Sequence, residues 1–246
     1  MENEICCRES RDMKLPQDIN TFFNFFAKEK QLIEALPSQQ HRRILLLSIL
    51  DTLGKCAFPN ERSNRKRFLG LIDSFSKWPD KDRISLIQLK YLLDKSLPQE
   101  HLDLKKEVND RISKWPYGII LRPAECDPLA TDLLKFQNTK NKEMIKKTRY
   151  AALLWTIRNF AVHEFRDAGH GIPLSDNNST PYYHGFDRLQ RDGIGYEDET
   201  WELYFPWQFI SDLVFICLDN LKNYCKDKFI NPYDAFNFGP SWFPYD

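Results

Sequence analysis

The apolar positions of this chain recur at helical spacing over most of its length. Residues 18–36 carry an apolar side chain every three or four positions, and residues 37–58 do so more densely, with Ser38 at the start and Pro59 beyond the end. The same period predicts further helices at 61–76, 84–96, 101–115, 127–137 and 206–229. The pattern therefore predicts an all-α fold.

Two short regions depart from the helical period. Residues 117–123 are branched and bounded by Gly118 and Pro123, and residues 201–205 are similarly short and apolar. The intervening residues 170–199 are rich in Gly, Pro, Asp, Asn and Ser, which is typical of a long loop or an irregular hairpin. We expect a few short strands in the 117–123 and 180–205 regions of an otherwise helical bundle.

The longest helix is predicted at residues 140–167, which contain neither Pro nor Gly and end before Ala168 and Gly169. No internal repeat or low-complexity linker interrupts the chain. A single domain spanning residues 1–246 is therefore predicted, with N-terminal helices at 15–115 and a second group at 127–229. A boundary near 116–127 is the alternative.

Apolar runs in the sequence are short. The longest, such as 44–50 and 212–218, fall far below the ~20 residues that a membrane-spanning helix needs. The first residues are charged rather than apolar, which predicts a cytoplasmic protein without a membrane segment. The six cysteines include no C-x-x-C pair, so we expect reduced thiols.

The charges balance, with 35 Lys and Arg against 35 Asp and Glu. This excludes a protein that holds nucleic acid chiefly through overall positive charge. A polyanion site must be local, and the basic segments at 60–68 and 140–150 are candidates. Solvated helix faces are the alternative interpretation of both segments.

Residues 151–165, AALLWTIRNFAVHEF, are mostly apolar but contain Arg158, Asn159 and His163. On a regular helix, Asn159 and His163 share a face, whereas Arg158 and His163 lie roughly 140° apart. We therefore expect Arg158 and His163 of one helix to flank a groove rather than to meet.

A guanidinium in this apolar segment needs an acidic partner, a phosphate or water. One interpretation is structural: Asp51 or Glu164 pairs with Arg158, while Asn159 and His163 form hydrogen bonds inside the bundle. Asp51 itself lies in an apolar helix, and we expect it to pair with an arginine such as Arg67 or Arg158.

The order Arg, Asn, three residues, His on a core helix just before a glycine resembles the motif of the HEPN superfamily, which is Arg, four to six residues, His, often with a polar residue after the arginine. Here the motif is Arg158-Asn159-Phe160-Ala161-Val162-His163. The resemblance covers residues 148–169 and implies a HEPN-like helical bundle that forms a two-fold homodimer, with a nucleic-acid cleft between the two motif helices.

The resemblance also implies a metal-independent endoribonuclease that needs no cofactor. In such an enzyme His163 would transfer protons, Arg158 would bind the phosphoryl oxygens, and Asn159 would orient His163 or contact the phosphate. The products would be a 2′,3′-cyclic phosphate and a 5′-hydroxyl. The resemblance further implies a toxin or an anti-phage defence effector that acts on RNA, with an inhibitory protein as a further partner.

Residues around the motif are candidates for supporting roles. Arg166, Lys146, Lys147 and Arg149 are the candidates for binding the RNA backbone. Asp51 and Glu164 are the candidates for positioning the motif residues.

Two other functional classes fit the same sequence. The first is a catalytically silent HEPN-like module for dimerisation or nucleotide binding. The second is a helical protein-interaction protein that contacts its partner through the aromatic tail at residues 230–246. His163, His170 and His184, with Asp167, Asp176 and Asp187 nearby, follow no known metal-ligand spacing, so no metal is expected.

Overall fold

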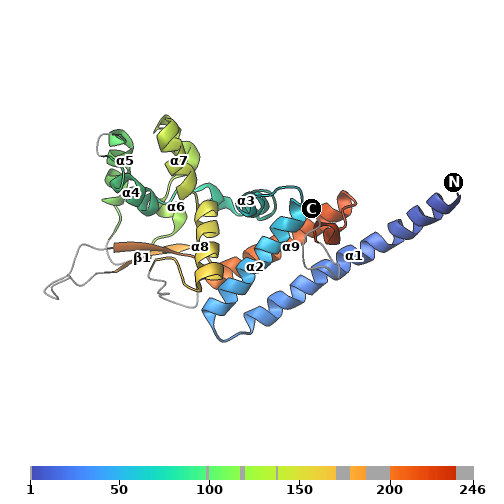
Figure 1. Ribbon diagram of the computed structural model, residues 1–246. Helices are drawn as coiled ribbons and strands as arrows, with labels where there is room; N and C mark the ends of the chain where they lie inside the picture. Colours follow the sequence, from blue (N-terminus) through green and yellow to red (C-terminus); the bar gives the residue numbers. More distant parts are fainter. Residues whose placement is uncertain are drawn as a thin grey trace. The chain divides into compact units, whose positions relative to one another are not determined.

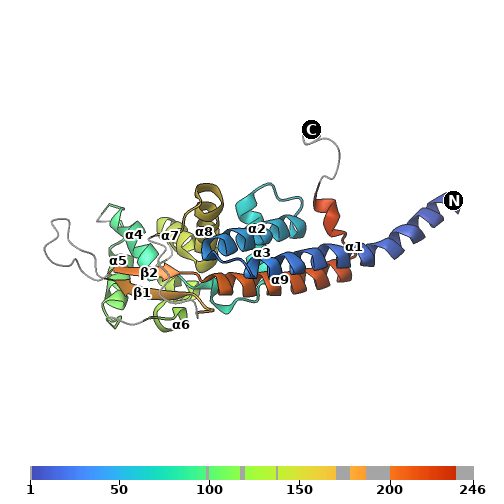
Figure 2. The ribbon, with the colours of Figure 1, turned by 90° about the horizontal axis from the view of Figure 1, so that it is seen from below.

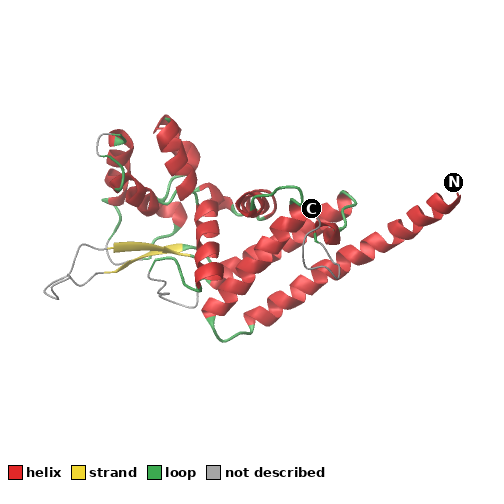
Figure 3. Cartoon of the chain, in the orientation of Figure 1, coloured by secondary structure: helices red, strands yellow, loops and turns green. Residues whose placement is uncertain are grey.

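The computed structural model describes residues 2–97, 100–116, 120–136, 138–169, 178–186 and 200–236, without the side chains of 2–13, 139 and 186. The chain is mainly α-helical with a small two-stranded antiparallel hairpin (Figures 1 and 3). The expected helical class, with short strands in the 180–205 region, is therefore confirmed. In the other expected strand region, Leu121 forms a β-bridge with Tyr183, and residues 117–119 lie outside the described residues.

Packing divides the chain into two compact units. One unit is Met1–Lys77 with Ser211–Asp246, and the other is Trp78–Ile210. The second division falls inside helix α9 (Trp207–Asp227), which therefore contributes residues to both units. That the whole chain forms a single domain stays a prediction.

The first unit is built from long helices. It contains α1 (Glu2–Glu34), α2 (Gln39–Ala57), α3 (Asn64–Phe75), most of α9 and the short 3-10 helix η3 (Pro232–Ala235). Serine caps begin two of them, because the hydroxyls of Ser38 and Ser63 accept from the backbone N–H three residues later. α1 begins well before the predicted start at residue 18 and runs through Pro16.

The core of this unit lies between α2 and α3. Leu50 and Leu53 of α2 and Phe68 of α3 are fully buried. Gly54 lets the two helices approach closely, because a Cβ at this position would lie 3.1 Å from the carbonyl oxygen of Arg67.

Helix α1 contacts α9 and η3, the two C-terminal elements of this unit. Figure 2 shows α1 and α9 side by side, and the two helices line a common groove. The Phe22 ring meets the Tyr233 ring of η3 edge to face at 5.2 Å between centroids. The beginning of the aromatic tail therefore packs on α1, whereas residues 237–246 lie outside the described residues.

The second unit combines shorter helices with the hairpin. Its elements are η1 (Pro79–Asp82), α4 (Leu86–Asp94), α5 (Leu102–Ile112), α6 (Pro123–Cys126), η2 (Ala130–Phe136), α7 (Thr139–Thr148), α8 (Tyr150–Glu164), β1 (Tyr182–Phe186) and β2 (Thr200–Tyr204). β1 and β2 pair antiparallel, with Tyr182 opposite Tyr204 and His184 opposite Glu202. Leu89 of α4, Leu104 of α5 and Ile145 of α7 pack in one buried cluster.

The prediction of a single helix at 140–167 is wrong. The helix is interrupted at Arg149, and two helices, α7 and α8, form in its place (Figure 1). Arg149 has an extended backbone, with φ −61° and ψ 137°. The Ser85 N–H donates to the Thr148 carbonyl at 3.0 Å, and the Tyr150 N–H donates to the Arg83 carbonyl at 2.9 Å. Pairing with a distant segment thus replaces helical hydrogen bonds at this point.

Among the described residues, no helix combines the length and the apolar character that crossing a bilayer requires. Free thiols are present at Cys56, Cys126, Cys217 and Cys225, and the side chains of Cys6 and Cys7 lie outside the described residues.

Candidate functional site at the end of helix α8

The candidate site lies on the last two turns of α8, which ends five residues before the predicted glycine stop. The helix ends at Glu164, and Phe165 adopts the left-handed conformation with φ 52° and ψ 37°. The N–H groups of Phe165 and Arg166 both donate to the Phe160 carbonyl, which closes the helix. His163 therefore occupies the final turn.

Arg158 and His163 meet within one chain. Arg158 Nη1 lies 2.7 Å from His163 Nε2. The prediction that these two side chains flank a groove without meeting is therefore wrong. The ideal helical angle describes the directions of the Cβ atoms, whereas the long arginine side chain extends past Asn159 and reaches the imidazole.

Asn159 belongs to the same cluster. Its Oδ1 accepts a second hydrogen bond from Arg158 Nη1, at 3.2 Å. The Arg158 guanidinium also lies over the Trp155 ring, 5.1 Å from its centroid, where a cation–π attraction holds it. The three motif residues thus form one connected group on a single helix.

The hydrogen bond fixes the tautomer of His163. An arginine has donors and no acceptor, so Nε2 of His163 must be the acceptor. The imidazole in this arrangement is neutral and carries its proton on Nδ1. Its remaining donor therefore points away from Arg158.

Burial differs sharply between the two partners. Arg158 is buried, with 6% of its surface exposed, whereas His163 is exposed. The pair thus connects a charge inside the unit with an imidazole at its surface. An exposed imidazole is accessible to a ligand or to a second copy of the chain.

Glu164 and Arg166 pair with each other. Glu164 Oε2 accepts from Arg166 Nε at 2.7 Å, and both side chains are about half exposed. The Arg166 guanidinium stacks on the Phe160 ring at 3.9 Å from its centroid. Arg166 lies beyond the end of the helix, and binding of the RNA backbone by Arg166 stays a prediction.

The basic residues predicted to share the motif helix lie elsewhere. Lys146 and Lys147 are exposed on α7, where Lys146 pairs with Glu143 at 3.3 Å. Arg149 lies at the break and donates to Asp82 Oδ1 at 3.0 Å. Arg149 therefore has a structural role at the junction of α7 and α8, and RNA binding by these residues stays a prediction.

The remaining predicted residues are spread over the chain. Asp51 lies on α2 of the first unit, and its predicted pairing with Arg67 or Arg158 stays a prediction, although Arg67 donates to Asn64 Oδ1. His184 is buried on β1. His170, Asp176 and Asp187 lie outside the described residues.

The sequence interpretation missed a buried carboxylate beneath the start of α8. Asp127 Oδ2 accepts from the hydroxyls of Tyr150 and Tyr183, at 2.6 and 2.7 Å, and its Oδ1 accepts from the Leu86 N–H at 3.0 Å. Burial raises the pKa of Asp127 to about 7, although these hydrogen bonds and Arg83 lower it in part. An aspartate before a proline gave no signal of partners 23 and 56 residues away.

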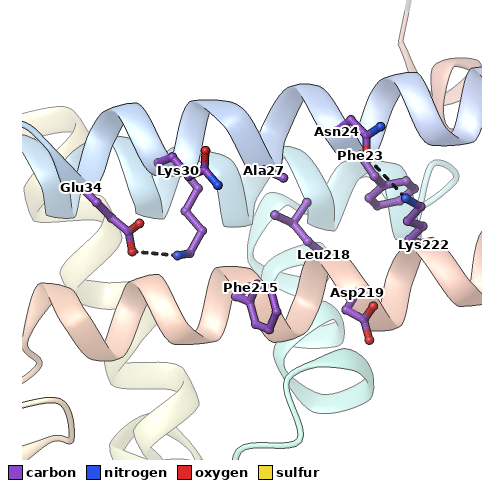
Figure 4. A pocket seen from close by; sticks show the side chains of 10 residues that line it. Phe23, Asn24, Ala27, Lys30, Glu34, Phe215, Leu218, Asp219 and Lys222 are labelled. Atoms are coloured by element: carbon purple, nitrogen blue, oxygen red, sulfur yellow. Dashed lines mark hydrogen bonds and ion pairs between the residues drawn. The ribbon is translucent and has the colours of Figure 1, made fainter.

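The first unit also contains a pocket, and its lining residues are far from Arg158 and His163 in the sequence. It has a volume of about 380 Å³ between α1 and α9, with the exposed ring of Phe215 at its side (Figure 4). Its cations have partners within the pocket, since Lys30 pairs with Glu34 at 2.7 Å and Lys222 donates to Asn24 at 3.5 Å. Glu34 and Asp219 line the pocket together with the two lysines, so its acidic and basic side chains balance and no excess positive charge favours a polyanion.

Comparisons with protein-family models, with curated proteins and with solved structures give no significant match to this chain.

Proposed function

We propose that the chain is a HEPN-like, metal-independent endoribonuclease that cleaves RNA as a homodimer. The observation that carries the proposal is the hydrogen bond between buried Arg158 and exposed His163 at the end of α8. It joins a permanent positive charge to a proton-transfer group, and these are the two groups that RNA transesterification needs.

Substrate binding would change the partner of Arg158. A phosphodiester oxygen is a charged acceptor and competes better for the guanidinium than a neutral imidazole nitrogen does. When Arg158 turns to the phosphate, Nε2 of His163 loses its donor and can accept the proton of the ribose 2′-hydroxyl. The resting pair thus becomes reactive only when a phosphate is bound.

The reaction then follows ordinary RNA transesterification. The 2′-oxygen attacks the adjacent phosphorus, the bond to the 5′-oxygen breaks, and Arg158 stabilises the charge on the phosphorane. The leaving 5′-oxygen takes a proton from a second acid. In the proposed homodimer that acid is His163 of the second copy: when its own Arg158 also turns to the phosphate, its Nε2 takes a proton from solvent and the imidazolium donates that proton to the leaving oxygen. The exposure of His163 is consistent with such an approach.

The cellular role belongs to the same proposal. A toxin or an anti-phage defence effector in the cytoplasm would need control of this activity, and an inhibitory protein partner would provide it. No cofactor takes part in the proposed chemistry.

One observation favours a second candidate function. Arg158 and His163 satisfy each other within one chain, which is also what a catalytically silent module for dimerisation or nucleotide binding would need. In that case the pair stabilises the end of α8. A helical protein-interaction protein is the third alternative, for which the exposed Phe215 beside the α1–α9 groove would be a contact.

The test is cleavage of a mixed-sequence RNA by purified protein in excess EDTA. We expect products with 2′,3′-cyclic phosphate ends, no cleavage of the matching DNA, and a rate loss of about 10²- to 10⁴-fold for His163→Ala. Arg158→Ala should lose a comparable factor. His41→Ala, at an exposed position on α2, is the matched control and should keep the full rate.

Three outcomes would contradict the nuclease. Cleavage that EDTA abolishes would indicate a metal enzyme. Equal rates for wild type and His163→Ala would indicate a contaminating nuclease. A stable homodimer with no cleavage of any RNA would support the silent module instead.

A further inference from the structure

A small pocket lies beside the motif on the same helix. It has a volume of about 140 Å³, and Leu153, Thr156, Ile157 and Phe160 of α8 form one of its walls. These positions are three and four residues apart, so they form one stripe along the helix. Gln88 of α4 and Phe205 after β2 contribute to the opposite side.

The pocket stripe borders the stripe of the motif. At about 100° per residue, His163 lies roughly 20° from Thr156 and roughly 60° from Phe160 around the helix axis. His163 is also one turn beyond Phe160 along the axis. It does not line the pocket, and its ring contacts Arg158, so the part of a ligand that comes nearest the imidazole would be one that extends from the pocket past Phe160 toward the end of α8.

A cation lies against Phe160, one of the residues that line this pocket. Arg166 stacks on the Phe160 ring at 3.9 Å from its centroid, and about half of its side chain is exposed. Phe160 thus has an aromatic ring that lines the pocket and is covered by a guanidinium that reaches solvent. The arrangement suits a ligand with a flat apolar part and an attached anion.

Gln88 supplies a polar group to the pocket. Among the described residues, its side-chain amide makes no hydrogen bond, and the side chain is half-buried. An amide offers both donors and an acceptor, so it can bind the edge of a heterocycle. The other walls at Leu153, Ile157 and Leu203 are apolar.

We propose that this pocket binds one unpaired nucleobase of a nucleotide that flanks the cleaved bond. The inference rests on the proposed ribonuclease activity, because that activity explains why a base would lie beside His163. The base would contact the Phe160 ring and Gln88, and its phosphate would lie toward Arg166 and His163. The volume is well below the ~300–1,000 Å³ of drug-sized sites, so a single heterocycle is a better match than a larger ligand.

The test uses methyl NMR spectra of the intact protein in EDTA, titrated with each of the four nucleoside 5′-monophosphates. We expect saturable shifts at the methyl groups of Leu153, Ile157 and Leu203, which line the pocket. Ribose 5-phosphate, which has the anion without the base, should leave these methyl groups unchanged. Shifts of equal size with ribose 5-phosphate would overturn the proposal.

Three variants sharpen the test. Thr156→Phe would fill the pocket from an exposed helix position, and Thr131→Phe, at an exposed position outside the pocket, is its matched control. We expect the first to weaken nucleotide binding at least about tenfold and the second to leave it unchanged. Gln88→Leu should reduce the preference among the four bases by about tenfold. If Thr156→Phe binds the nucleotides as tightly as wild type does, the pocket is not the binding site and the proposal is overturned.

The two proposals fail separately. If nucleotides shift the pocket methyl groups but RNA is never cleaved, the base pocket stands and the nuclease falls. If RNA is cleaved through His163 but the methyl groups do not respond to any nucleotide, the nuclease stands and the pocket falls.

Discussion

The hydroxyl of Tyr150, the first residue of α8, donates to Asp127 Oδ2 over 2.6 Å in the buried interior of the second unit. Tyr183 of β1 donates to the same oxygen. One carboxylate thus joins the start of the motif helix to the hairpin. The position of Arg158 and His163 depends on this junction, since both lie on the helix that it holds.

We expect Tyr150→Phe to lower the free energy of unfolding by about 1.5–3 kcal/mol, because it leaves a buried carboxylate short of one donor. Urea denaturation followed by circular dichroism measures this change. Tyr91→Phe is the matched control, since the Tyr91 side chain on α4 is 44% exposed, and it should stay within about 0.5 kcal/mol of wild type. If the two changes lower the free energy of unfolding equally, the hydrogen bond between Tyr150 and Asp127 does not stabilise the fold as proposed.

Asp127 should make stability depend on pH. Its pKa rises from an ordinary 3.8 to about 7 in the folded protein, so the folded state holds this proton more tightly than the unfolded state does. The stabilisation is present below about pH 4 and is lost as pH rises to about 7. At about 1.4 kcal/mol per pKa unit, the full loss is on the order of 4 kcal/mol.

Comparison with Asp127→Asn isolates this effect, because the variant lacks the titrating group. Unfolding free energies should be measured for both proteins between about pH 5 and about pH 8. We expect the variant to gain on wild type as pH rises to about 7 and the difference to level off above that pH. A constant difference across the range would show that Asp127 does not titrate there.

The His163 tautomer is a direct test of the Arg158 hydrogen bond. Long-range ¹H–¹⁵N spectra should show a neutral ring with its proton on Nδ1, because Nε2 accepts from Arg158. Arg158→Met removes the donor, so the ring should lose this fixed tautomer. His41, which is exposed on α2, provides the internal reference and should not change. An Nε2–H ring in wild-type protein would rule out the pair.

Gly169→Ala should destabilise the turn that follows α8. Gly169 has φ +67°, and a Cβ there would lie 2.1 Å from Glu202 Oε1. The left-handed conformation alone costs about 1 kcal/mol for alanine, and the contact with the carboxylate adds to it. The change in unfolding free energy measures the sum.

A second substitution separates the two causes at Gly169. In the Glu202→Ala background, Gly169→Ala should cost only about the 1 kcal/mol of the backbone conformation. If the cost is the same in both backgrounds, Glu202 does not lie against this turn.

Much of the helical framework could be predicted, because its signals are local. Ser38 marks the start of α2 by capping it, and the apolar period of 206–229 gives α9 within a few residues. The break at Arg149 could not be predicted in this way. Residues 140–167 favour a continuous helix, and only backbone pairing with residues 83–85 interrupts it.

The same contrast between local and long-range signals applies to the candidate site. Residue order alone identified Arg158, Asn159 and His163 as a group, and the structure joins all three. The angular argument failed because it considered directions and ignored the length of the arginine side chain. Asp127 was missed because its partners come from elements far along the chain.

Because of the extended backbone at Arg149, the directions of the side chains on α8 do not depend on the number of residues in α7. Residues added to or removed from α7 would change the length of the basic helix without rotating α8, because α8 begins anew at Tyr150. The surface presented by Lys146 and Lys147 can therefore diverge between related chains while the orientation of the motif side chains is preserved.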